Sequence, residues 1–175
     1  MPKRPILRPE HLSEDSQKLF DVLNESEDIA VVTVGAAYVD ACLGSLLYGL
    51  LLESSITDKL LDVRGGALGT FSARADACYV LGLISKRLHQ DLSTIAAIRN
   101  RFAHHHLQMD FSDTEVQELC SRLKYVYGPD DSQRLQMQRY MNGPRSQFAL
   151  TVVMITQRLV LTALTPTRIK ERRGW

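Results

Sequence analysis

Residues 29–52 form the longest apolar run in the chain, and this run limits the folds that the chain can adopt. A run of this length is long enough to cross a membrane as one helix. Asp40 lies near its middle, however, and Glu27, Asp28 and Glu53 flank it where a membrane span would carry lysine or arginine. We therefore predict a long central helix that neighbouring helices or a second subunit cover, and no membrane span.

The size and composition of the chain are those of one soluble domain. It has 175 residues, of which 45% are hydrophobic and 23% are charged, close to ordinary globular values. Cys42, Cys78 and Cys120 each lie in an apolar stretch, which favours buried thiols in a reducing compartment over a disulfide framework. No apolar signal segment follows the basic start of the chain. We therefore expect a cytoplasmic protein.

Apolar residues recur at helical spacing, and two-residue alternation is absent over any useful length. The sequence therefore predicts an all-α, single-domain helical bundle of about six or seven helices around the long apolar central helix. We expect a flexible basic N-terminal arm at 1–10, one all-helical domain at 11–165 and a basic C-terminal tail at 166–175. Helices are expected from Ser13 onwards, at 29–52, shortly after Thr57 and Asp58, at 71–84 with Thr70 as its N-cap, at 86–106, from Ser112 to about Tyr127, at 133–141 and at 145–164.

Charge is sorted along the chain although the net charge is only +1. Residues 11–62 hold ten carboxylates and two lysines, whereas residues 132–175 hold eight basic residues and one carboxylate. One interpretation is that oppositely charged helices lie beside each other, because screening makes near neighbours dominate. The other is that the basic segment 132–175, the basic rear of the chain, contacts an anionic partner, which would be a nucleic acid or an acidic protein. The overall pI of about 7.8 is below the range typical of nucleic-acid-binding domains.

The segment 98–106, Ile-Arg-Asn-Arg-Phe-Ala-His-His-His, is the most unusual part of the sequence. On an ideal helix Arg99 falls on the apolar, core-facing stripe of Leu88, Leu92, Ile95 and Phe102. A buried guanidinium stays charged and needs a carboxylate or carbonyl partner. We expect Arg99 to be buried and to tie its helix to the glycine-bearing turn at 64–70, with Asp62, Asp76 or the carbonyls of that turn as its partners. We call an arginine in this role a buried fastener.

A functional interpretation of the same segment uses the spacing Arg-Asn-x-x-x-His of Arg99, Asn100 and His104. A histidine suited to proton transfer and a guanidinium that holds a phosphate are two of the parts needed to cleave RNA. Arg99 and His104 lie about 140° apart around an ideal helix. They would therefore converge only if the helix distorts near His104 or if two subunits combine their side chains.

Other kinds of chemistry find little support in the residues. Consecutive His104, His105 and His106 point in different directions on a helix, and Asp110 completes no familiar ligand spacing, so we expect no metal. The turn at 64–70 matches neither a Walker loop nor a dinucleotide fingerprint. No serine or cysteine stands in a nucleophile motif. We therefore expect no cofactor and favour no catalytic residue.

Several motifs together resemble the mannitol operon repressor family of bacteria, over about residues 30–125. They are Leu60-Leu61-Asp62, Gly69-Thr70-Phe71-Ser72-Ala73-Arg74, Leu81-Gly82-Leu83-Ile84 and the segment from Ile98 to His104. The resemblance implies an all-helical transcriptional regulator, in which Asp62, Arg74, Arg99 and His104 occupy the family's motif positions with structural roles. The shorter Arg-Asn-x-x-x-His element is also similar to the signature of the HEPN superfamily. That similarity implies a ribonuclease in which Arg99, Asn100 and His104 of two subunits meet in a dimer cleft.

Of these two interpretations we favour the regulator, acting mainly through protein–protein contacts. No pair of short helices about a tight turn, with a polar second helix, can be placed in the sequence, so direct DNA binding is not expected. If the chain does contact nucleic acid, the candidates are Arg168, Lys170, Arg172 and Arg173 in the basic tail. We also expect a homo-oligomer, with a dimer as the first expectation. The HEPN-type ribonuclease remains the alternative.

Overall fold

The structure is a computed structural model that describes residues 9–105, 109–124 and 142–164. Within these ranges the chain forms seven α-helices and no strand. They are α1 (Pro9–Glu25), α2 (Asp28–Leu50), α3 (Ser55–Leu61), α4 (Phe71–Val80), α5 (Lys86–His105), α6 (Thr114–Ser121) and α8 (Pro144–Leu164). The predicted all-α bundle of about six or seven helices is confirmed.

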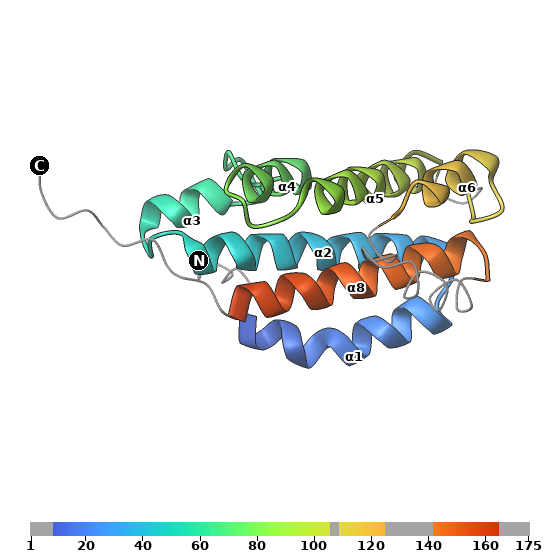
Figure 1. The fold of residues 1–175 in the computed structure, drawn as a ribbon, viewed down its shortest axis with the longest axis horizontal. Helices are drawn as coiled ribbons and strands as arrows, with labels where there is room; N and C mark the ends of the chain where they lie inside the picture. The colour runs from blue at the N-terminus through green and yellow to red at the C-terminus, as the bar shows by residue number, and fades with distance from the viewer. Residues whose placement is uncertain (1–8, 106–108, 125–141, 165–175) are drawn as a thin grey trace, which may run out of the picture.

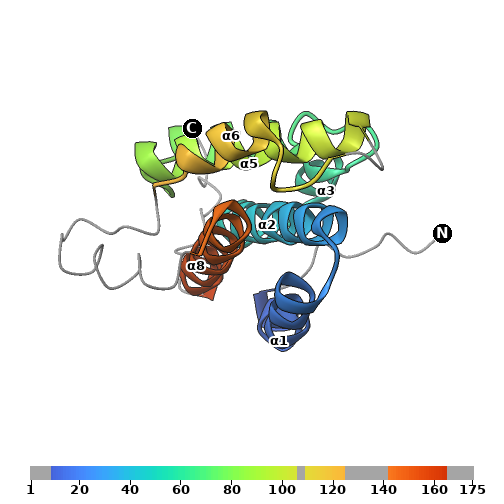
Figure 2. The same ribbon diagram turned by 90° about the vertical axis from the view of Figure 1, so that its right-hand side faces the viewer.

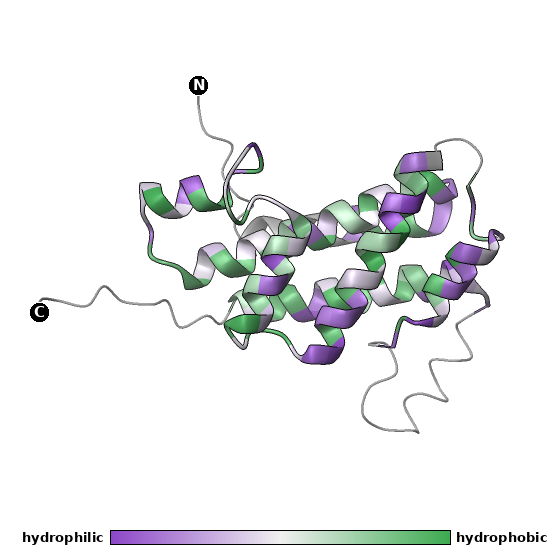
Figure 3. Cartoon of the chain, turned by 90° about the horizontal axis from the view of Figure 1, so that it is seen from above, coloured by the Kyte–Doolittle hydropathy of each residue, from purple (hydrophilic) through white to green (hydrophobic). Residues whose placement is uncertain are grey.

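The central helix of the bundle is α2. It packs against α1 and α8 on one side and against α4 and α5 on the other, so α3–α6 and the α1–α8 pair lie on opposite sides of it (Figures 1 and 2). Hydrophilic and hydrophobic residues alternate along the helices, as expected for amphipathic elements around one core (Figure 3). Val32, Leu43 and Leu46 of α2 are fully buried in that core. The prediction of a long apolar helix at the centre is therefore confirmed.

Two helices, α2 and α8, are long and apolar enough to cross a membrane by length and composition alone. In α2, 56% of the apolar window is buried inside the bundle, and in α8 the share is 39%. The core helix of a soluble protein passes the same test of length and hydropathy. The burial of α2 therefore accounts for its apolar run without a membrane.

Side-chain caps fix where three of the helices begin. Thr70 accepts a hydrogen bond from the Ala73 amide at the start of α4, as predicted. Asp113 accepts from the amides of Glu115 and Val116 at the start of α6. Ser54 does the same for α3, which therefore begins earlier than the sequence predicted.

Other helix boundaries also differ from the sequence prediction. The first helix begins at Pro9 rather than near Ser13, since proline is well tolerated at the first helical position. The fourth ends at Val80 rather than 84, because Gly82 adopts a positive φ of 72° and the Leu83 amide turns back to the Cys78 carbonyl. Residues 1–8 of the predicted arm, the predicted helix at 133–141 and the tail at 166–175 lie outside the described residues.

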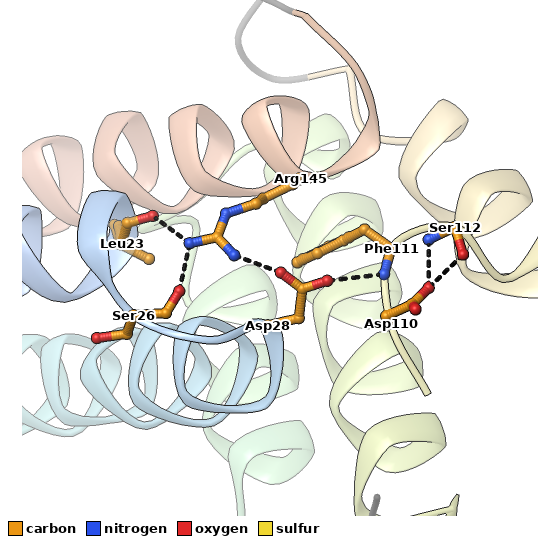
Figure 4. A network of polar contacts seen from close by, with 7 residues as sticks. All are labelled: Leu23, Ser26, Asp28, Asp110, Phe111, Ser112 and Arg145. Carbon is orange, nitrogen blue, oxygen red and sulfur yellow. Dashed lines mark hydrogen bonds and ion pairs between the residues drawn. The ribbon is translucent and has the colours of Figure 1, made fainter. Parts of the chain in front are cut away.

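The acidic front and the basic rear of the chain meet at the beginning of α2 (Figure 4). Arg145, at the start of α8, forms an ion pair with Asp28 and donates a further hydrogen bond to the Ser26 carbonyl. The second oxygen of Asp28 accepts a hydrogen bond of 3.0 Å from the Phe111 amide. This network ties α1, α2, α8 and the segment before α6 together. It supports the interpretation that oppositely charged segments lie side by side.

Candidate functional site

Arg74 is the most deeply buried basic side chain that the structure describes, with 6% of the side chain exposed. Its Nε donates to the Leu68 carbonyl at 2.9 Å and its Nη2 to the Leu61 carbonyl at 3.1 Å. Its Nη1 lies 3.0 Å from Oδ2 of Asp40 on α2. The fork of the guanidinium thus joins α4 to the end of α3, to the turn before α4 and to α2, using donors that a lysine lacks.

Glycines make room for this arrangement. A Cβ added at Gly44 of α2 would lie 3.4 Å from Nη1 of Arg74, so the guanidinium rests against the helix backbone where a side chain is missing. In the turn, a Cβ at Gly66 would lie 2.3 Å from the Leu60 carbonyl oxygen, and one at Gly69 would lie 2.4 Å from that of Asp62. The turn at 64–70 is therefore a compact backbone unit that presents the Leu68 carbonyl to Arg74.

Asp40 is only partly compensated by its pairing with Arg74. Its Oδ1 atom is buried and has no hydrogen-bond partner among the described residues. Burial raises the pKa of Asp40 above its usual value of 3.8, and the nearby charges of Arg74 and Arg99 oppose that rise. The carboxylate thus carries a desolvation cost that its ion pair does not remove entirely.

Arg99 is not the buried fastener that the sequence predicted. It is half-buried on α5, and its Nη2 donates to Oδ1 of the neighbouring Asn100 at 3.0 Å. Its guanidinium lies over the ring of Phe71, 5.6 Å from the centroid. Because the ring of Phe71 is buried beneath it, Arg99 covers the core and does not enter it. The role predicted for Arg99 belongs to Arg74.

The partners predicted for Arg99 have other contacts. Asp62 accepts hydrogen bonds from the backbone amide and the Nε of Arg64, at 3.0 and 3.4 Å. Asp76 pairs with Nε2 of His89 at 2.7 Å. The carbonyls at either end of the glycine-bearing turn, those of Leu61 and Leu68, are the ones that Arg74 occupies.

His104 lies on the exposed surface of α5, which continues through His105 without a break. The helix therefore does not distort near His104 in the way that would bring it to Arg99 within one chain. Of the predicted family positions, Asp62 and Arg74 lie at the same turn, whereas Arg99 and His104 lie further along α5. Candidate nucleic-acid residues Arg168, Lys170, Arg172 and Arg173 are outside the described part of the chain.

The described residues also bear on metal, thiol and small-molecule sites. No group of three or more His, Cys, Asp or Glu side chains that could hold a metal occurs within residues 9–105, 109–124 and 142–164. Burial raises the pKa of the Cys42, Cys78 and Cys120 thiols to about 12, so they are protonated at neutral pH. A cavity of about 100 Å³ lies between the α4–α5 turn and α8, which is small for a metabolite.

Sequence reasoning missed Asp40 and the pair formed by Asp28 and Arg145. From the sequence, Asp40 counts only as a charge that opposes a membrane span. A lone carboxylate inside an apolar helix needs a buried partner, so a signal was present. Arg145 carried no comparable signal, since its partner lies 117 positions away in the sequence.

Comparisons with known proteins agree with the resemblance seen in the motifs. The family model described as mannitol repressor matches residues 52–160, the span that includes α3–α6 and most of α8. The curated mannitol operon repressors of two Escherichia coli strains, K12 and O6:H1, are each 28% identical to the chain over 114 residues. Each match covers 59% of this chain and 58% of the relative, so the chain spans a little over half of the relatives' length. No solved structure matches the chain significantly.

Proposed function

Because the chain belongs to the mannitol repressor family, we propose that it is a bacterial transcriptional regulator of the repressor type. The match over residues 52–160 carries this proposal, since it covers the turn at 64–70 and all of α4, where Arg74 is buried. For a regulator of bacterial transcription we further propose a cytoplasmic location.

We propose that the regulator acts through protein–protein contacts rather than by reading DNA directly. A helix-turn-helix joins two helices by a short turn at a steep angle and exposes polar residues on the second. In the described residues α4 and α5 are joined by a short turn but run antiparallel: Phe71 at the start of α4 lies under Arg99, and Tyr79 near its end stacks on His89. This arrangement is unlike a helix-turn-helix.

The other short helices are also poorly suited to DNA. The exposed residues of α6 include Glu115 and Glu118, which phosphates would repel. The helices α3 and α4 are separated by residues 62–70, and the only arginine of α4, Arg74, is buried. Lys59 on α3 is the single exposed basic side chain of these two helices, and neither helix carries the amide side chains that also serve in base readout.

The proposal can be tested in an E. coli strain that lacks its own mannitol operon repressor. We expect expression of this chain to lower the output of a mannitol-promoter reporter, and we expect the Arg74→Ala variant, which loses the buried fastener, to have no effect. An unchanged reporter with well-folded protein in the cell would contradict the repressor proposal.

Direct DNA binding is tested separately by gel shift with the purified chain and the promoter DNA. We expect no specific shift by the chain alone. A shift that weakens steeply with salt, as phosphate contacts do, and that disappears when residues 167–175 are removed would instead establish the basic tail as a DNA contact.

The ribonuclease alternative predicts a different result. Purified protein would cleave RNA, and both Arg99→Ala and His104→Ala would abolish cleavage while the helical content is retained. We expect no cleavage that depends on these residues, since the reported relatives are named as repressors and Arg99 is held by Asn100.

A further inference from the structure

A small cavity with a mixed apolar and polar lining lies between the α4–α5 turn and α8 in the described chain. Leu83, Leu88 and Leu159 line it, together with the polar Ser85 and Arg158. Exposed apolar side chains occur on the elements on both of its sides. They are Val80 (83% exposed) and Leu81 (46%) at the end of α4, and Leu161 (61%) on α8. Large apolar residues exposed together in this way are typical of a contact surface.

The charged residues of the α4–α5 turn and of α8, which wall this cavity, are basic, whereas Asp76 on α4, just before this turn, is 67% exposed and pairs with His89. Residues 77–90 and 142–164 contain no aspartate or glutamate. They contain Lys86, Arg87 and Arg158 near the cavity and Arg145 at the far end of α8. A partner that fits here therefore combines an apolar side chain with carboxylates, because opposite charges across an interface steer association and fix its register.

Another part of the same chain has this chemistry. Phe20 on α1 is 52% exposed. Among the exposed large hydrophobic residues of the described chain, Phe20 and Tyr79 are the two that carry an aromatic ring. Asp21 and Glu25 of α1 and Glu27 at the N-cap of α2 are exposed carboxylates that follow Phe20 in the sequence, and Lys18 is an exposed lysine of α1. Within its own molecule α1 packs on α2 and α8 through buried Leu19 and Leu23, so Phe20 and the carboxylates remain on the surface.

We propose that α1 of a second copy of this chain occupies the surface around this cavity, with Phe20 as the apolar anchor. The cavity of about 100 Å³ can take the outer part of one side chain but not a drug-sized ligand. The carboxylates that follow Phe20 face the basic residues around the cavity. In a two-fold dimer the contact occurs twice, since each copy offers both α1 and the cavity.

The proposal is tested by sedimentation equilibrium of the full chain over a range of protein concentrations. We expect a reversible dimer whose dissociation constant rises at least about tenfold in Phe20→Ala and in Arg158→Glu. Both side chains lie at the surface, so circular dichroism and the urea midpoint should change little.

Two matched variants control for general effects of removing surface apolar area or reversing a charge. Ile56→Ala removes an apolar side chain that is 69% exposed on α3. Arg64→Glu reverses an arginine whose side chain is 81% exposed. We expect both to dimerise as the parent chain does. A parent chain that stays monomeric would overturn the proposal, as would a dimer that survives both Phe20→Ala and Arg158→Glu.

Discussion

Two arginine–aspartate pairs attach other helices to α2, one along its second half and one at its beginning, and they differ in burial. Arg74 has 6% of its side chain exposed and pairs with Asp40, whereas Arg145 has 34% exposed and pairs with Asp28. Both arginines also donate to backbone carbonyls. Because a buried charge has no water to replace a lost partner, the two pairs should respond very differently to substitution.

We expect the largest effect from Arg74→Ala. It removes the contacts of Arg74 with three residues at once and leaves the Asp40 carboxylate and the Leu61 and Leu68 carbonyls without their Arg74 donor. Breaking a buried pair from one side costs about 3–5 kcal/mol of unfolding free energy, which can unfold a domain of this size. Urea denaturation followed by circular dichroism measures the loss. Arg74→Lys should recover only part of it, because one ammonium cannot reach all three acceptors. Equal stability of the Lys variant and the parent would contradict the three-way role.

The next effect concerns the backbone turn that presents carbonyls to Arg74. Gly66→Ala should cost about 1–3 kcal/mol of unfolding free energy or more, since the added Cβ would clash with backbone that cannot easily move. Gly65→Ala is its matched control, because a Cβ there meets nothing within 4 Å. We expect Gly65→Ala to leave the urea midpoint nearly unchanged. Equal losses for the two variants would show that the turn is not rigid.

At the other end of α2, Arg145→Ala should cost about 1–2 kcal/mol, because its half-exposed position lets water replace part of what is lost. The loss should also be local. Cys120 on α6 should react faster with a thiol reagent, whereas Cys42 and Cys78 near Arg74 stay protected. Site-resolved mass spectrometry after labelling measures the three rates. Uniform exposure of all three thiols would show instead that Arg145 supports the whole bundle.

The comparison also shows what the sequence could and could not predict. Helical periodicity and cap residues such as Thr70 predicted the fold, since these signals are local. A buried partner for Asp40 was not predicted, although a lone carboxylate in an apolar helix needs one. Which arginine supplies that partner depends on how deeply each side chain lies in the core, whereas a helical projection gives only the direction in which it points. Arg99 faces the core as predicted, but the ring of Phe71 fills the space beneath it.

The pairing of Asp28 with Arg145 lay beyond sequence reasoning for a different reason. The sorting of charge along the chain left two interpretations open, and only one of them placed acidic and basic segments side by side. The particular pair follows from the angle at which α8 returns to the start of α2, which no local pattern encodes. The boundary of α4 was missed because Gly82 was interpreted as part of the helix, although a glycine near a helix end commonly stops it.

A smaller effect should come from the pH dependence that Asp40 adds. Burial raises the folded-state pKa of Asp40 above 3.8, so between that value and the raised pKa the folded chain holds a proton that the unfolded chain has released. Unfolding free energy contributed by Asp40 is therefore largest at low pH and falls as pH rises through the folded pKa. Urea denaturation at several pH values should show this fall in the unfolding free energy of the parent chain minus that of Asp40→Asn. A difference that increases with pH over the same window would mean that the Arg74 pair outweighs burial.

The smallest effect should come from Arg99→Ala, the substitution that the helical projection alone would rank as severe. Arg99 keeps water access, its hydrogen bonds go to the adjacent Asn100, and its contact with the Phe71 ring is that of a partly exposed cation. Such interactions contribute less than about 1 kcal/mol. The urea midpoint of Arg99→Ala should therefore stay close to that of the parent, far from that of Arg74→Ala. If the two variants lose similar stability, the division between a buried fastener on α4 and a surface cover on α5 is wrong, and both arginines belong to one cooperative unit around Asp40.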